Sequence, residues 1–140
     1  MGADASSLKV RNAIKALNTA LFYLQEREIR EAPDTNTTWQ EKTIYSAGPQ
    51  DYIVTGKLFT SGDWLVDVSQ NVAPLSRTVY RVIIYNSEQN YHWLGDIRAD
   101  GDIEEISPFR SLSEQEGRET AAEFRRKNEI PPPSPGGYGH

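Results

Sequence analysis

The 140-residue chain contains no cysteine, only two histidines and no excess of basic residues. Without cysteine it forms no disulfide framework, no thiolate nucleophile and no cysteine-ligated zinc site. Fifteen lysines and arginines stand against twenty aspartates and glutamates, which gives a net charge of −5. Because an acidic surface repels a phosphate backbone, we expect no nucleic-acid partner.

Long hydrophobic runs are also absent. No stretch approaches the roughly 18–20 consecutive apolar residues of a membrane-spanning helix, and the N-terminus has neither the basic nor the apolar region of a secretory signal. We therefore expect a soluble, cytoplasmic protein with no membrane span. The segment from Met1 to Ser6 matches the N-myristoylation pattern, with Gly2 as the acceptor, but so short a match is also typical of an ordinary N-terminus.

The length predicts one domain, since domains usually have roughly 100–200 residues, and a chain of this size can bury a core without metal. The C-terminal end is different in composition, because residues 130–140 hold four of the eight prolines and three of the ten glycines. We predict a single domain over 1–128 and a disordered Pro/Gly-rich tail over 129–140. Glu129 stands where a polyproline ligand would carry a basic residue, which favours a spacer.

Two helices are predicted, one at each end of the domain. Apolar residues recur at steps of four and three from Leu8 onward, after Ser6 or Ser7 as N-cap. The predicted stripe consists of Val10, Ile14, Leu17, Leu21 and Leu24. The second helix is expected to begin at Ser111 in a capping box with Glu114 and to run toward Lys127. Its apolar content is small and Gly117 interrupts it, so we expect it to be peripheral.

Between the helices the hydrophobic period changes to two, which predicts strands. The predicted strands are Gln40–Ser46, Tyr52–Thr60, Trp64–Ser69, Thr78–Asn86, Tyr91–Ala99 and a short Ile103–Ile106. Turn signals such as Ser61-Gly62-Asp63 and Asp100-Gly101 separate them and are short enough for antiparallel hairpins. The predicted fold is therefore α+β, with an N-terminal helix packed on an antiparallel meander of four to six strands.

Strand alternation divides the apolar residues between two sheet faces. The face expected beneath the N-terminal helix carries Trp64, Val66, Val68, Tyr80, Val82, Ile84, Tyr91, Trp93, Gly95 and Ile97. The opposite face carries Leu65, Val79, Ile83, Tyr85 and Leu94 beside Asp67, Arg81, His92, Asp96 and Arg98. This second face is too apolar to be left bare, so the C-terminal helix, a second copy or a partner protein should cover it.

Residues for catalysis or metal binding are scarce. The acidic stretch from Asp96 has Arg98 where a calcium loop needs an oxygen ligand, and Ser107 in place of the terminal bidentate glutamate, so we assign no metal and no cofactor. His92 is expected to be an exposed or packing histidine, and no nucleophile-elbow or phosphate-loop motif is present. Asp67 and Asp96 are the strand aspartates suited to a pocket, but both lie opposite the main core face. No catalytic residue is therefore assigned.

The arrangement of one helix before an antiparallel meander, over Ser6–Ile106, resembles the cystatin-like architecture of cystatins and PepSY-type domains. The segment Tyr52-Ile-Val54-Thr-Gly56 is similar to the cystatin first-hairpin motif Gln-x-Val-x-Gly, with Tyr52 in place of the glutamine. Trp93 is similar to the second-hairpin tryptophan, without its preceding proline. The strand pair from Trp64 and from Tyr80 resembles PepSY-type pairs. The resemblance implies either protease inhibition or an accessory binding role.

Three functional hypotheses remain open. The leading hypothesis is a non-catalytic accessory domain that binds a protein partner, or a second copy of itself, through Leu65, Val79, Ile83, Tyr85 and Leu94. The alternative is a small-ligand binder or enzyme with a pocket between helix and sheet, lined by Tyr80, Tyr91 and Trp93. The third is a cystatin-like protease inhibitor.

Overall fold

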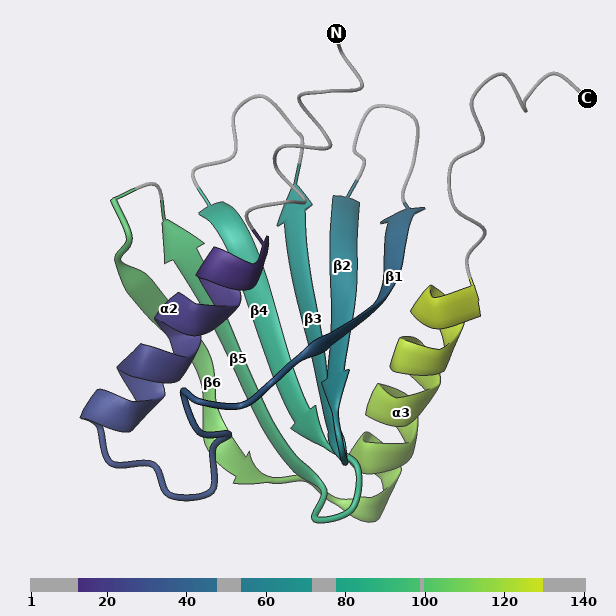
Figure 1. Ribbon diagram of the computed structural model, residues 1–140. Helices are drawn as coiled ribbons and strands as arrows, with labels where there is room; N and C mark the ends of the chain where they lie inside the picture. Colours follow the sequence, from purple (N-terminus) through teal and green to yellow (C-terminus); the bar gives the residue numbers. More distant parts are fainter. Residues whose placement is uncertain (1–12, 48–53, 72–77, 99, 130–140) are drawn as a thin grey trace, which may run out of the picture.

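The computed structural model describes residues 13–47, 54–71, 78–98 and 100–129, and shows an α+β fold (Figure 1). Its elements are α2 (Ala13–Glu26), β1 (Gln40–Ala47), β2 (Val54–Ser61), β3 (Trp64–Asn71), β4 (Thr78–Asn86), β5 (Tyr91–Arg98), β6 (Ile103–Ser111) and α3 (Glu114–Glu129). The six strands form one sheet in the order β1-β2-β3-β4-β5-β6, and every neighbouring pair is antiparallel. The predicted meander is confirmed.

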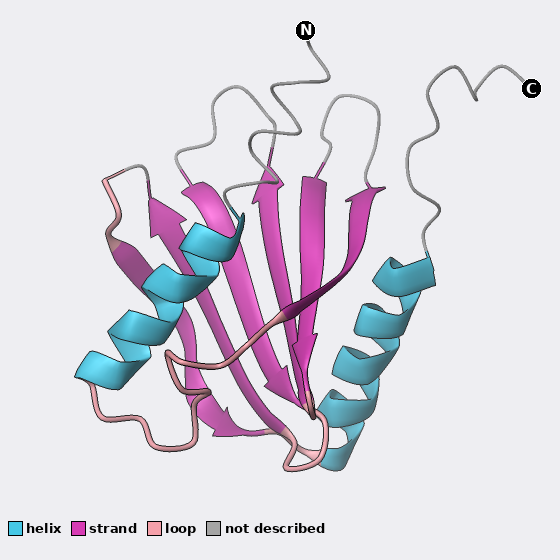
Figure 2. Ribbon diagram, viewed as in Figure 1, coloured by secondary structure: helices cyan, strands magenta, loops and turns pink. Residues whose placement is uncertain are grey.

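Helix α2 crosses one face of this sheet over β3, β4 and β5 (Figure 2). Its six buried residues are all alanine or leucine: Ala13, Ala16, Leu17, Ala20, Leu21 and Leu24. The small alanine side chains let the helix lie close to the sheet. The predicted stripe was wrong at Ile14, which is 37% exposed because the buried face is centred one position away, on the alanines. Val10, Ser6 and Ser7 lie outside the described residues.

The sheet face beneath α2 forms the main core, as the strand alternation predicts. Phe59, Val66, Ile84 and Trp93 pair successively across β2 to β5 and are all buried. Trp93 has no exposed surface, packs against the Tyr23 ring, and donates a hydrogen bond from Nε1 to a Glu105 carboxylate oxygen at 2.8 Å. Trp93 of β5 thus contacts both helix α2, through the Tyr23 ring, and the neighbouring strand β6, through Glu105.

The last strand and the last helix differ from the prediction. Strand β6 continues to Ser111, because pairing with β5 places Arg110 opposite His92 and Ser111 opposite Tyr91. The helix therefore begins later, and its capping box is formed by Ser113 and Glu116. The capping signal was recognised two residues too early. Helix α3 also runs through Glu129, the first residue of the predicted tail, whose remainder lies outside the described residues.

Candidate functional site

Helix α3 lies against the sheet face opposite α2, alongside the β1 edge (Figure 1). We call this surface the α3 face. Its buried apolar cluster contains Tyr45, Leu58, Tyr85 and Phe124, and the Phe124 ring stacks on Tyr85 at a centroid distance of 6.0 Å. Successive side chains of a strand point alternately to the α3 face and to the α2 face, so the two helices cover opposite sides of the sheet.

Three of the five predicted interface residues contact this cluster. Tyr85 is buried in it, and Leu65 and Ile83 are partly buried against it. Leu94 pairs with Ile83 across β4 and β5 and is also partly buried. Val79 belongs to β4, but its side chain lies outside the described residues. Helix α3 therefore covers much of the face that the sequence identified as too apolar to be bare.

A carboxylate lies at the centre of the α3 face. Asp67 is 1% exposed, accepts a hydrogen bond from the Tyr45 hydroxyl at 2.7 Å, and forms an ion pair with Lys127 of α3. Both carboxylate oxygens are therefore engaged. The same contacts tie the C-terminal half of α3 to β1 and β3, together with a hydrogen bond between Thr43 and Asn128.

Burial dominates the electrostatics of this cluster. Burial raises the pKa of Asp67, and the nearby Lys127 ammonium opposes that rise. Burial also raises the pKa of Tyr45 above its ordinary range, and the neighbouring Asp67 carboxylate adds to the rise, so the phenol stays protonated. The hydroxyl is thus held as a hydrogen-bond donor to Asp67.

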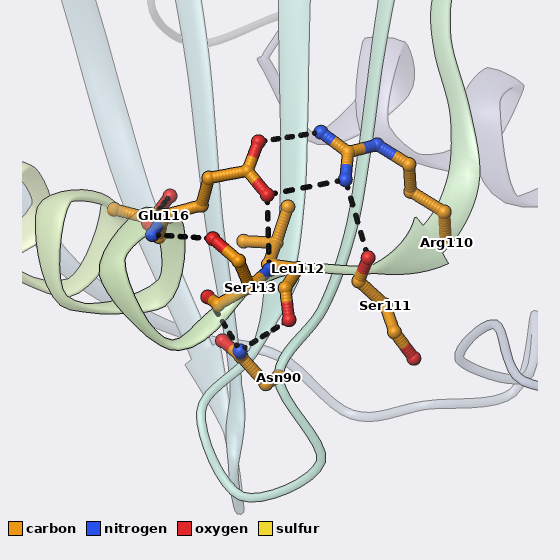
Figure 3. A network of polar contacts seen from close by, with 7 residues as sticks. Asn90, Arg110, Ser111, Leu112, Ser113 and Glu116 are labelled. Carbon is orange, nitrogen blue, oxygen red and sulfur yellow. Dashed lines mark hydrogen bonds and ion pairs between the residues drawn. The ribbon is translucent and has the colours of Figure 1, made fainter.

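A second polar network positions the start of α3 (Figure 3). The side-chain nitrogen of Asn90 donates to the carbonyl oxygens of Leu112 and Ser113, at 2.9 and 3.2 Å. Asn90 has a φ of 60°, a left-handed conformation that asparagine tolerates better than most residues. Through these bonds the β4–β5 turn sets where β6 ends and α3 begins.

The Arg110–Glu116 ion pair completes this network (Figure 3). Arg110 contacts both oxygens of Glu116 at 2.9 and 3.4 Å, and Glu116 accepts a further bond from the Ser113 backbone N–H. These bonds lower the pKa of Glu116 to about 2, with the hydrogen bond from Arg110 as the largest cause. The carboxylate therefore stays ionised through the neutral and mildly acidic range.

Two grooves flank α3 where the helix leaves the sheet uncovered. The first, which we call the Asp67 groove, has a volume of about 320 Å³ and lies between α3 and strands β3 to β6. Its lining consists of Asp67, Ile83, His92, Arg110, Leu112, Glu116, Glu119, Thr120, Glu123, Phe124 and Lys127. The second, the Leu65 groove, has a volume of about 280 Å³ and lies toward β1 and β2, between Leu65, Leu58 and the helix residues Ala121 and Phe124.

His92 lines the Asp67 groove from β5. Burial lowers the pKa of its imidazole, and the Arg110 guanidinium lowers it further, which favours the neutral ring at pH 7. Its Nδ1 atom has no hydrogen-bond partner among the residues that the structure describes. The sequence predicted an exposed or packing histidine. His92 is partly buried, and it lies in a groove that the sequence did not reveal.

The three residues predicted to line an α2-side pocket occupy three different environments in the described part of the chain. Trp93 fills the space beneath α2, Tyr91 packs against the Phe109 ring at 5.8 Å, and Tyr80 borders a cavity of only about 10 Å³. A large aromatic ring at the centre of this helix–sheet contact leaves little room for a ligand there. Open space borders both helices. Beside α2 it lies at the C-terminal half of the helix, where Phe22, Tyr23 and Ile103 border a cavity of about 370 Å³, and beside α3 it lies in the two grooves described above.

Three of the residues that carry the cystatin resemblance, Val54, Gly56 and Trp93, lie inside strands. Val54 and Gly56 belong to β2, and the Tyr45 ring lies so close to Gly56 that a side chain there would overlap it. Trp93 belongs to β5 and is fully buried. Tyr52 lies outside the described residues. In this arrangement Trp93 presents no surface to a protease.

The sequence pattern does not predict the Asp67 cluster, although it singles out Asp67 as a strand aspartate. Asp67 interrupts an apolar run between Val66 and Val68, and that interruption is the signal the sequence offers. Its partner Lys127 is sixty positions away, in helix α3. The alternation of residues along the strands does not reveal where this helix lies on the sheet. Asp96, the other strand aspartate, is also buried and forms a two-point ion pair with Arg81 at 2.7 and 3.0 Å.

Metal-ligating clusters and membrane-spanning helices are both absent from the described part of the chain. Within those ranges, no group of three or more histidine, aspartate or glutamate side chains is arranged to hold a metal ion. None of the helices in the same ranges combines the length and the apolar character needed to cross a membrane.

Comparisons with protein-family models, curated proteins and solved structures find no significant match to this chain.

Proposed function

We propose that this chain is a non-catalytic accessory domain that binds a protein partner through the α3 face, in the Asp67 groove beside α3. The observation that carries the proposal is the incomplete cover of that face. Ile83 lies in the lining of one groove and Leu65 in the lining of the other, although α3 packs between them. Apolar side chains that border open grooves beside a helix are typical of protein-binding surfaces.

The pairing of Asp67 and Glu116 favours binding over catalysis. Asp67 is held by Tyr45 and Lys127, and Glu116 is held by Arg110. A general acid or base must exchange its proton with a substrate, and a group whose oxygens are both engaged does so poorly. These groups are better suited to fixing α3 in place.

A small ligand in the Asp67 groove is the second candidate function. The groove volume of about 320 Å³ lies near the lower end of small-molecule sites, which span roughly 300–1,000 Å³. A buried carboxyl with a raised pKa, such as Asp67, is common at functional sites. This candidate retains the hypothesis of a pocket between helix and sheet, but places it beside α3.

A charge placed in the Asp67 groove tests the proposal. Thr120 lies on the groove side of α3 and Ala122 is exposed on the same helix outside the groove lining. We expect Thr120→Arg to prevent capture of partner proteins that the wild-type chain retains from its native source, and Ala122→Arg to capture the same set. Both variants should melt near the wild-type temperature, because neither substitution replaces a core residue.

Two results would contradict the proposal. Equal capture by the wild type and by Thr120→Arg would mean that the groove takes no partner. Loss of capture by both variants would place any binding elsewhere on α3. Light scattering of the purified chain distinguishes a second copy from another protein, since only self-association raises the mass of the chain alone.

A further inference from the structure

The Asp67 groove has an apolar floor and one predominantly acidic wall. Ile83, Leu112 and Phe124 provide apolar surface from β4, from the β6–α3 connection and from α3. The α3 wall carries Glu116, Glu119 and Glu123, which are spaced by three and four positions and therefore lie on one side of the helix.

The charges around this groove do not balance. Its lining contains four carboxylates and two permanent cations, Arg110 and Lys127, while the lowered pKa of His92 keeps the imidazole from contributing a full charge at pH 7. Arg110 is already bound to Glu116, and Lys127 to Asp67. Glu123 pairs with Arg126, which lies outside the lining, so the excess negative charge of the groove is that of Glu119.

Glu119 is the carboxylate with the least compensation. Glu116 has Arg110, and Glu123 has Arg126 at 2.5 Å. Glu119, in contrast, forms no ion pair within the described part of the chain and accepts only a long hydrogen bond of 3.4 Å from Gln115. An exposed carboxylate beside an apolar floor is complementary to a cation attached to an apolar chain.

We propose that the Asp67 groove binds an extended segment of the partner protein in which an apolar side chain is next to a lysine or arginine. This inference rests on the proposed function and adds the chemistry of the partner. The apolar side chain contacts Ile83, Leu112 and Phe124, and the basic side chain pairs with Glu119. The groove volume of about 320 Å³ accommodates one or two side chains, which suits a peptide segment better than a whole helix.

Selection from a display library of random peptides, with the folded wild-type chain as bait, tests this inference without knowledge of the natural partner. Peptides that bind the wild type and fail to bind Thr120→Arg are groove-dependent. We expect this set to be enriched in lysine or arginine beside an apolar residue. Glu119→Lys should weaken the binding of these peptides about tenfold at low salt and by a smaller factor at high salt.

Glu114→Lys is the matched control for the charge change. Glu114 is on the same helix with its side chain 91% exposed, and it is absent from the groove lining. It should leave the affinity of the selected peptides within about twofold of wild type. Equal weakening by both substitutions would mean that net charge, and not Glu119, recognises the basic residue, and would overturn the inference.

The outcomes separate this inference from the proposed function. Groove-dependent peptides without enriched basic residues would overturn the inference and leave the proposed function standing, and so would peptides whose binding Glu119→Lys does not weaken. If no peptide depends on the groove, the inference is also overturned. The capture experiment with Thr120→Arg then decides the proposed function on its own.

Discussion

The two helices cover opposite faces of one sheet by different means. In α2, six of 14 residues are buried, and all are alanine or leucine. In α3, two of 16 residues are buried, Gly117 and Phe124, and polar side chains supply much of the remaining attachment. The first contact depends on the amount of apolar surface removed from water, and the second on a small set of directional bonds.

This difference agrees with where the open space lies at each helix. The grooves beside α3 reach side chains of the central strands, such as Asp67 and Leu65, whereas the cavity beside α2 is bordered by the β5–β6 turn and the start of β6. A net contribution of about 1 kcal/mol per hydrogen bond is modest, because water offers the same bond to the unfolded chain. Directional bonds therefore place α3 accurately without drawing it tightly onto the sheet. Apolar contact along the whole of α2 closes the space beneath that helix, and Trp93 occupies its centre.

The largest expected effect comes from the α2 side. Leu17 is fully buried, so Leu17→Ala should lower the free energy of unfolding by about 2–5 kcal/mol, since it removes apolar contacts and leaves a cavity. Urea denaturation followed by circular dichroism measures the change. A loss below about 1 kcal/mol would contradict the close packing of α2 on the sheet.

A smaller loss is expected for the main apolar residue of α3. Phe124→Ala should cost about 1–3 kcal/mol, less than the roughly 3–5 kcal/mol usual for a buried phenylalanine, because grooves border the side chain and let water occupy the space. Hydrogen exchange should increase in α3 and remain slow in α2. A uniform increase across both helices would mean that α3 and the core unfold as one unit.

Substitution of Gly117 tests how closely the start of α3 packs against the β4–β5 turn. In an exposed helix, glycine to alanine stabilises by about 1 kcal/mol. Here a Cβ at Gly117 would overlap the Asn90 amide, and the Tyr85 hydroxyl donates a hydrogen bond to the Gly117 carbonyl at 3.3 Å. We expect Gly117→Ala to destabilise the protein by about 1 kcal/mol, the opposite sign. A melting temperature above wild type would show that the Asn90 contact yields easily.

The smallest effect is a pH dependence at the same end of α3. Folding lowers the pKa of Glu116 from its ordinary 4.5 to about 2. The stabilisation from its ionised carboxylate is therefore complete above pH 4.5 and is lost as the pH falls toward 2. Glu116→Gln keeps an acceptor for the Ser113 N–H but cannot ionise. The difference in melting temperature between this variant and the wild type should shrink below pH 4.5, and a constant difference would contradict the shift.

Alternation along the strands was sufficient to predict both faces of the sheet. It separated Val66 and Ile84 from Leu65 and Ile83 correctly, because adjacent strand residues point to opposite sides whatever their tertiary partners. It could not indicate how far β6 extends. Pairing with β5 carries that strand past Pro108 to Ser111, and such pairing is a tertiary interaction that local turn signals do not report.

The candidate site was only partly predictable for the same reason. Its apolar residues Leu65, Ile83 and Tyr85 could be recognised as a surface that needs cover. The pairing of Asp67 with Lys127 could not be recognised from the sequence, because it depends on where α3 crosses the sheet. The grooves could not be recognised either, because they are spaces left between elements and have no sequence signal of their own.

The meander has a consequence for the order of assembly. Every strand pairs with its neighbour in sequence, so the sheet needs only short-range closures, and such pairings form early in folding. Helix α3 follows β6 in the chain, so we expect it to dock last and to leave the α3 face in water for a time during synthesis. Asp67 lies in the cross-strand row that joins Leu58, Ile83 and Leu94, so we expect its carboxylate to oppose aggregation through this face in that interval. Pulsed hydrogen exchange during refolding should find the strands protected before α3, and simultaneous protection would contradict this order.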